Sequence, residues 1–344
     1  MLIVRLNSKK IFRTLLCVCV FSSAGIAIAD VDVMHFWVSP SERDALDVFA
    51  DSYRANGGNW VDDKQEDHST LKRNAIERIS NGYPPTAMQW VVSHKLFDLV
   101  SAGVLTSFDE DQKPEALSQL HPLLLDIVTR DSKISAIPVS IHAENWAFYN
   151  AKIIRELNLQ PAKNWEQMFE HMAVIEKAGY LPIAMSESSW EHDHIFKSML
   201  VAEGGIPLVS AIDTGSISKT LEGKLQNSLE HFIKLRDIFQ RIGYKAESWS
   251  LASKAVIEGR AAIQLMGDWA KGEMMNAGAV PGKDFLCAMA PGNEEVYLAA
   301  IDVFVLPKLV GVKNKRTQEA FIDVILNKKN QMDFSEKKRV YSCS

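Results

Sequence analysis

Six of the eight tryptophans follow predicted strands or stand in polar segments, away from the apolar faces of predicted helices. Aspartate, glutamate, asparagine and histidine stand beside them. Indole rings can stack on the apolar faces of a ligand, while fixed carboxylates and amides bind hydroxyl groups around its rim. These residue types therefore predict a site for a pyranose-like ligand. The six tryptophans are Trp37, Trp90, Trp146, Trp190, Trp249 and Trp269.

Other kinds of site have weaker support. The segment WEHDH places His192 and His194 beside Asp193, but a solvated loop accounts for it better than a metal site. The run GRAAIQLMG places a helix before a strand, which reverses the order of a nucleotide-binding motif. We therefore predict neither a metal nor a cofactor. Glu42 and Asp302 could flank a sugar as the acid and base of a glycoside hydrolase, which stays as an alternative.

The first 29 residues have the pattern of a secretory signal peptide. MLIVRLNSKKIFR carries four basic residues and no acidic one, and the apolar run TLLCVCVFSSAGIAIA then ends in an A-x-A site before Asp30. The apolar run is too short for a permanent membrane anchor. We therefore expect export to the periplasm.

The charge balance argues against some classes of partner. The full chain has a net charge of −5, and loss of the four basic residues of the signal would leave −5 − 4 = −9. An acidic exported protein is a poor match for nucleic acid or anionic lipid, so we predict no nucleic-acid partner. Of the four cysteines, Cys287 and Cys343 lie beyond the signal, and the sequence leaves open whether they pair.

Strand-like apolar runs alternate with helical periods, as in an α/β protein with mostly parallel sheets. In SPSERDALDVFADSYRANGG, Leu46, Phe49 and Tyr53 fall on one helical face, and in LKRNAIERISNG we expect Ile76 and Ile79 to face inward. The 344 − 29 = 315 residues beyond the signal exceed the usual size of one domain, so we expect two lobes. Ligands in such folds bind beyond the carboxyl ends of strands.

Two of the carboxylates also have structural explanations. Ser39, Pro40 and Glu42 form the pattern of a capping box with proline in the first turn, and the capping carboxylate would keep a second oxygen for a ligand. Asp268 follows a strand and Gly267 and opens the helical segment WAKGEMM. We therefore interpret Asp268 as an N-cap and not as a ligand-binding residue.

Seven segments, in order along the chain, carry a resemblance to a known family. They are VDVMHFWVSPSE, GYPPTAMQW, AIPVSIHAENWAFYNAKI, LQPAKNWEQM, VIEGRAAIQLMGDWAKGE, PGKDFLC and AIDVFVLP. The chain resembles the extracellular solute-binding proteins of carbohydrate ABC importers, and most of all their periplasmic glucose- and mannose-binding branch. The resemblance implies two α/β lobes joined by crossing strands, with a sugar held in the cleft by hinge closure. It implies lobe 1 at residues 30–138, completed by about 303–344, and lobe 2 at residues 139–302.

The resemblance also implies which residues contact the sugar. Phe36 stands where the family usually has a second tryptophan, so a stacking face is kept while an indole N–H is lost. A lysine common in the glucose- and mannose-binding branch falls at Val91 here. The predicted sugar-binding residues are Phe36, Trp37, Glu42, Gln89, His142, Asn145, Trp146, Trp249 and Asp302.

By this resemblance the protein would be a monomer that binds glucose or mannose and delivers it unchanged to membrane-embedded ABC permease subunits. A receptor that serves a chemosensor would have the same sequence features. After TQEAFIDVILNKKNQMDFSEKK the chain ends in RVYSCS, where family members continue with further helices. We interpret this as a truncation near Arg339, and we expect a truncated product to be less stable and to bind sugar weakly.

Overall fold

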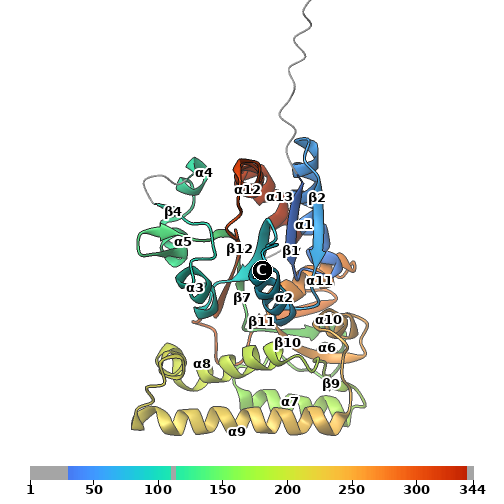
Figure 1. Cartoon of the computed structure of the whole chain (residues 1–344). Helices are drawn as coiled ribbons and strands as arrows, with labels where there is room; N and C mark the ends of the chain where they lie inside the picture. The colour runs from blue at the N-terminus through green and yellow to red at the C-terminus, as the bar shows by residue number, and fades with distance from the viewer. Residues whose placement is uncertain (1–29, 110–113, 339–344) are drawn as a thin grey trace, which may run out of the picture.

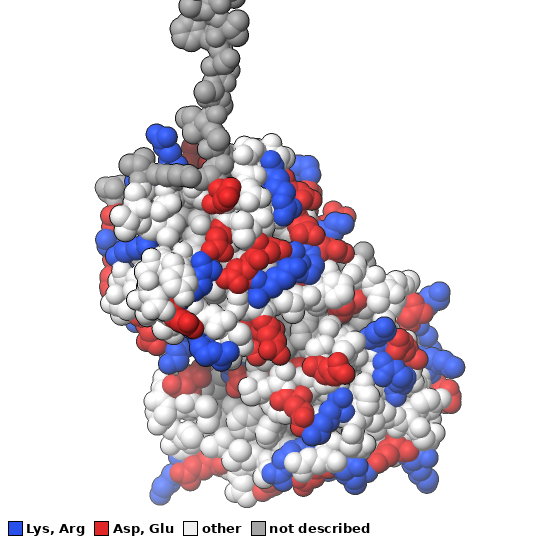
Figure 2. All heavy atoms as spheres, turned by 45° about the vertical axis from the view of Figure 1, so that its right-hand side comes forward, with Lys and Arg blue, Asp and Glu red and all other residues white. Residues whose placement is uncertain are grey.

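The computed structural model describes residues 30–109 and 114–338, which form two α/β lobes (Figure 1). The predicted signal peptide and the predicted truncation point near Arg339 lie outside these residues. On the face shown in Figure 2, basic and acidic side chains are interspersed over both lobes. The two lobes, each built from a sheet and its covering helices, confirm the predicted two-lobed α/β fold.

Lobe 1 is built around a five-stranded sheet. Its strands, in spatial order, are β2 (Trp60–Lys64), β1 (Val31–His35), β3 (Ala87–Val91), β12 (Ala299–Val305) and β7 (Ile137–Ala143). Strand β1 is parallel to β2 and β3, whereas β12 is antiparallel to β3 and β7. The carboxyl ends of β1 and β3 therefore meet at one edge of the sheet, where the predicted ligand-binding residues begin.

Helices cover both faces of this sheet, because successive side chains of each strand point to opposite faces and both faces carry apolar residues. Val31 and Val33 of β1 and Phe304 of β12 pack toward one group of helices, and Met34 and Val303 pack toward the other. The first group is α1 (Pro40–Ala55), α12 (Val312–Leu326) and α13 (Lys328–Lys338). The second is α2 (His68–Ser80), α3 (His94–Ser101), α4 (Glu115–Ser118) and α5 (Pro122–Val128). A small sheet of β4 (Phe108–Asp109), β6 (Lys133–Ile134) and β5 (Thr129–Arg130) lies at the periphery.

Lobe 2 is built around a four-stranded sheet. Its spatial order is β11 (Phe285–Met289), β8 (Trp146–Asn150), β10 (Ala261–Met266) and β9 (Leu181–Ile183). Its helices are α6 (Ala151–Glu156), α7 (Trp165–Lys177), α8 (Ser189–Thr214), α9 (Lys219–Ile242), α10 (Trp249–Ile257) and α11 (Trp269–Asn276). Cys287 on β11 is disulfide-bonded. We propose that the chain crosses between the lobes from β7 to β8 and from β11 to β12, and the predicted lobe boundaries fall within β7 and β12.

Helix α8 has the length and hydropathy of a membrane-spanning helix, but other features assign it to the lobe 2 fold. Its helical geometry is interrupted at Gly205, where φ is 62°, and Pro207 follows. A positive φ of this kind favours glycine because side chains clash there. The helix also packs along α9.

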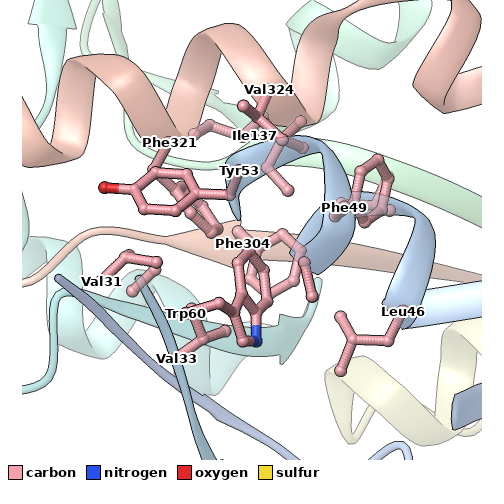
Figure 3. Packing of buried hydrophobic residues seen from close by; sticks show 14 of the residues in the cluster. Val31, Val33, Leu46, Phe49, Tyr53, Trp60, Ile137, Phe304, Phe321 and Val324 are labelled. Carbon is pink, nitrogen blue, oxygen red and sulfur yellow. The ribbon is translucent and has the colours of Figure 1, made fainter. Parts of the chain in front are cut away.

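The predicted N-terminal helix is confirmed as α1. Its capping box is formed: Ser39 Oγ accepts from the Glu42 N–H at 3.4 Å, and Glu42 Oε2 accepts from the Ser39 N–H at 3.1 Å. Leu46, Phe49 and Tyr53 are fully buried against the sheet and α12 (Figure 3). The amphipathic pattern and the cap therefore define this helix together.

The inward orientation predicted for Ile76 is wrong, because its side chain is 52% exposed. Leu71 and Ala75 are the buried residues of α2, and Ile79 packs partly against the same core. These three residues are four apart and form one stripe. Ile76 lies about 100° further around the helix, on the solvent side.

We expect Leu46→Ala to lower the free energy of unfolding by about 2–5 kcal/mol, because it leaves a cavity in the lobe 1 core. Ile76→Ala, on the next helix along the chain, is the matched control and should lower the free energy of unfolding by less than about 1 kcal/mol. Urea denaturation followed by circular dichroism measures both values. Equal losses in the two variants would contradict the assignment of Leu46 to the core and Ile76 to the surface.

Candidate ligand site between the lobes

A chain of buried polar groups begins at the carboxyl ends of the lobe 1 strands. Gln89 Oε1 accepts from the backbone N–H of Phe36 at 3.0 Å, and Gln89 Nε2 donates to Asp302 Oδ1 at 3.4 Å. The other oxygen of Asp302 accepts from Ser140 Oγ at 3.2 Å and lies 3.2 Å from His142 Nε2. Four of the predicted site residues, Phe36, Gln89, His142 and Asp302, are thus brought together.

His142 connects this chain of polar groups to lobe 2. Its Nδ1 lies 2.8 Å from Asp268 Oδ1, and Asp268 Oδ2 accepts from the Ala143 N–H at 3.0 Å. The Asp268 N–H in turn donates to the Ala143 carbonyl at 2.9 Å. Since Asp268 follows β10 whereas His142 belongs to β7, these bonds fix the two sheets relative to each other. We call the four linked polar side chains of Gln89, Asp302, His142 and Asp268 the interlobe chain.

The interpretation of Asp268 as an N-cap is therefore wrong for its side chain. Asp268 occupies the N-cap position of α11, but its carboxylate makes no capping hydrogen bond. Its backbone is helical, with φ −61° and ψ −18°, whereas capping residues usually have extended geometry. Both carboxylate oxygens are directed to β7 instead.

The two carboxylates control the protonation of His142. Burial alone would lower the pKa of His142, but hydrogen bonds to Asp268 and Asp302 outweigh burial and raise that pKa to about 9. Burial likewise opposes ionisation of Asp302, yet the hydrogen bond and charge of His142 hold its pKa below the usual value. At neutral pH the interlobe chain thus holds a protonated imidazole between two carboxylates.

In lobe 1, three aromatic residues lie beside the polar groups of the interlobe chain. The rings of Phe36 and His68 have centroids 5.2 Å apart, and the rings of His68 and Trp90 are perpendicular at 5.4 Å. Burial lowers the pKa of His68 to about 4, with a further lowering by Lys72 and an opposing effect of Asp302. His68 is therefore neutral at pH 7. We call Phe36, His68 and Trp90 the lobe 1 cluster.

A second group of rings lies beside His142 in lobe 2. Trp269 is in edge contact with His142 at 5.5 Å and lies 6.2 Å from Trp190 and 5.7 Å from His194. His194 Nε2 lies 3.1 Å from a carboxylate oxygen of Glu144. Trp190 and His194 belong to the first turns of α8, so the loop predicted for this segment is wrong. We call Trp190, His194 and Trp269 the lobe 2 cluster.

Two predicted site residues lie behind the site, in the lobe 1 core. Trp37 is 1% exposed and packs against Phe334 at 5.3 Å, with Lys338 Nζ 4.9 Å from its ring centroid. Glu42 is 8% exposed and lies 3.5 Å from the same Lys338 Nζ. Because successive side chains of extended backbone point to opposite sides, Phe36 reaches the site and Trp37 does not. This placement does not support stacking of a sugar on Trp37.

The remaining predicted residues lie in lobe 2. Asn145 is 2% exposed, and its amide bonds to Asn293, to the Val296 carbonyl and to the Leu298 N–H, so it fixes the segment after β11. Trp146 and Trp249 are half-buried and pack against the same core as Trp190 and Trp269. Trp249 begins α10 and is not in the loop that the sequence predicted. Ligand contact by these residues stays a prediction.

Three residues of the site, His68, Glu144 and His194, were missed by the sequence reasoning. Trp90 and Trp190 are among the six tryptophans at strand ends or in polar segments, so that sequence signal does point to this candidate site. His68 stands at the start of an ordinary helix, and no local pattern distinguishes it from a surface histidine. Only the packing of α2 over the ends of β1 and β3 brings it to Phe36 and Trp90.

The comparisons with known proteins concern the family and the fold of the chain. Residues 53–343 match the model of a family described as bacterial extracellular solute-binding protein. A probable sugar-binding periplasmic protein of Rhizobium meliloti (strain 1021) is 28% identical over 291 residues, which cover 84% of this chain and 70% of the relative. An ABC transporter extracellular-binding protein of Pyrococcus horikoshii is 26% identical over 295 residues, covering 81% of this chain and 64% of that protein.

Solved structures share the fold. A chitin oligosaccharide binding protein superposes with a TM-score of 0.74 at 19% identity, covering 92% of this chain and 81% of its own. The bacterial solute receptor AcbH, described as having an exclusive substrate preference for β-D-galactopyranose, has a TM-score of 0.71 at 14% identity, and the match covers 90% of this chain and 79% of AcbH. The match to the family model over most of the sequence shows that this chain belongs to the bacterial extracellular solute-binding proteins.

Proposed function

We propose that this protein binds a sugar between its lobes and delivers it, chemically unchanged, to the membrane-embedded permease of an ABC importer. The observation that carries the proposal is that aromatic rings of both lobes lie beside one buried chain of polar groups. Rings can stack on the faces of a pyranose while the polar groups bind its hydroxyls. The relatives named as sugar-binding and ABC transporter proteins support the same function.

Asp302 is the hydroxyl acceptor that we assign at the centre of the site. A carboxylate can accept about four hydrogen bonds, and Asp302 has contacts with Gln89, Ser140 and His142. One acceptor position is therefore left for a ligand. Gln89 and His142 hold the carboxylate in place, so it needs little ordering when a ligand binds. We propose glucose or mannose as the sugar, because the seven segments quoted from the sequence resemble the glucose- and mannose-binding branch.

Closure of the lobes is the motion that we propose for capture. Two groups of bonds between the lobes can be described: those of Asp268 with β7, and those of Glu273 with the first turn of α1. Glu273 Oε2 accepts from both the N–H and the Oγ of Ser41, at 3.2 and 2.8 Å. Opening of the cleft would break the Ser41 contact first, because α1 lies away from the crossing strands whereas His142 belongs to one of them.

The glycoside hydrolase alternative has little support at these residues. A general acid needs a carboxyl group with a raised pKa, whereas the pKa of Asp302 is lowered by His142. The carboxylate of Glu42 accepts the capping hydrogen bond of α1 and lies beside Lys338. The acid and base pair expected of a hydrolase is therefore not formed by Glu42 and Asp302.

We expect Trp269→Ala to weaken the binding of glucose or mannose at least about 10-fold, because it removes a stacking face of the lobe 2 cluster. Isothermal titration calorimetry measures the dissociation constant directly. The control is Phe196→Ala, which removes a ring that contacts Phe232 of α9 in the same lobe, outside the two clusters. Unchanged affinity in the Trp269 variant would contradict the proposed site.

The wild-type protein is also expected to release no chromophore from aryl glycosides of glucose or mannose. Measurable release would favour the hydrolase alternative, provided that it is lost in Asp302→Asn. An absorbance assay over several hours is sufficient, because the prediction is a complete absence of turnover.

The raised pKa of His142 predicts a loss of stability at alkaline pH. Its contribution is fully present below pH 6.5, the ordinary pKa, and is lost as the pH rises through about 9. The loss between pH 6 and pH 10 should be about 3 kcal/mol. Urea unfolding of the wild type and of His142→Gln at both values measures it. A pH dependence equally steep in the variant would show that another group is responsible.

A further inference from the structure

We infer that His68 and Trp90 together bind one hydroxyl group of the ligand on the lobe 1 side of the site. This inference rests on the proposed sugar-binding function and identifies two residues that determine its specificity. Neither residue is among the predicted sugar contacts, and both belong to the lobe 1 cluster.

Each of these two side chains has a buried nitrogen without a hydrogen-bond partner in the described part of the chain. The atoms are Trp90 Nε1 and His68 Nε2. Trp90 is only 1% exposed, and its ring meets the His68 ring edge-on at 5.4 Å. The great majority of buried polar atoms in folded proteins have a partner, so two neighbouring exceptions that also lie beside Phe36 of the candidate site are consistent with a place that a ligand can complete.

A hydroxyl group is the ligand chemistry that satisfies both atoms together. The indole N–H of Trp90 can only donate, whereas the neutral imidazole of His68 offers one acceptor nitrogen and one N–H. A hydroxyl both accepts and donates, so it can pair with Trp90 and with His68 in either tautomer. An anion would lack the proton for an acceptor nitrogen and would be repelled by Asp302. A metal cation would leave the indole N–H unpaired.

The pair is also positioned beside the groups assigned to the sugar. Phe36 packs on His68 at 5.2 Å, and its backbone N–H holds Gln89, which donates to Asp302. The charge of Asp302 also acts on His68. A sugar hydroxyl bound by Asp302 would therefore have a neighbour within reach of His68 and Trp90. The lobe 1 cluster would then supply one ring face and one polar pair for the same sugar.

The test removes each nitrogen while an aromatic ring is kept. We expect His68→Phe and Trp90→Phe each to weaken the binding of glucose or mannose by about 10-fold in calorimetric titrations. His68→Gln, which keeps an acceptor and a donor, should bind more tightly than His68→Phe. Affinity unchanged in both phenylalanine variants, or equal weakening in His68→Gln and His68→Phe, would overturn the inference.

Matched controls exist in the lobe 2 core. Trp165 is also 1% exposed with an unpaired indole N–H, and His171 is 8% exposed with an unpaired ring nitrogen. Both lie on α7, away from the two clusters. Trp165→Phe and His171→Phe should therefore leave the dissociation constant within about 2-fold of the wild type. A loss of affinity in these controls equal to that of the site variants would show a general effect of destabilisation and refute the inference.

Deoxy sugars identify the hydroxyl and separate this inference from the proposed function. The wild type should bind one monodeoxy analogue of its sugar about 10-fold more weakly, and His68→Phe should bind that analogue and the parent sugar equally. Additive losses for every analogue would overturn the inference while sugar binding stands. If the wild type binds neither glucose, mannose nor the oligosaccharides of chitin, the proposed function itself fails.

Discussion

The protonated His142 between Asp302 and Asp268 is the interaction on which the geometry of the candidate site depends. Each of these carboxylates would be costly to bury alone, and the imidazolium compensates both through direct contacts of 3.2 and 2.8 Å. One partner belongs to β12 of the first sheet and the other follows β10 of the second. This charge balance therefore helps to fix the relative position of the two sheets, and we propose that it lies at the strands that cross between the lobes, where a small rotation moves the outer parts of both lobes most.

This charge balance also orients the groups beside it. With its carboxylate held by β7, Asp268 begins α11 so that Trp269 meets the edge of His142. On the other side, Gln89 joins Asp302 to the backbone of Phe36. The centre of the site is thus held in place by internal hydrogen bonds that leave one acceptor position of Asp302, while among the described residues unpaired nitrogens remain in the surrounding rings of His68 and Trp90. A preorganised centre with unpaired groups at its margin favours a neutral, hydroxyl-rich ligand over a charged one.

Local patterns were sufficient for most elements, although the first turns of α8 and α10 were predicted as loops, and they were insufficient for the contacts between elements. The helix α1 was predictable because its cap and apolar stripe are both encoded within sixteen residues. The role of Asp268 was not, since its partner His142 is 126 residues away and the N-cap signal is purely local. Trp37 and Phe36 are adjacent in sequence, and Phe36 rather than Trp37 reaches the candidate site because α13 covers the other side and packs on Trp37. The resemblance predicts Asp302 as a sugar contact, which stays a prediction, and it could not resolve which side chains alternate toward the site at a strand end.

His142 and His68 of the candidate site show that the surroundings of a histidine decide whether its ring is charged or neutral. His142 touches two carboxylates directly, so their hydrogen bonds outweigh the cost of burial and the ring stays charged. Asp302 acts on His68 only through its charge, and the charge of Lys72 opposes that effect. Burial therefore dominates the pKa of His68, and the ring stays neutral. A charged imidazole is suited to joining lobes and a neutral one to pairing with a hydroxyl. Exchanging their surroundings would therefore exchange their functions, although the sequence gives no local sign of the difference.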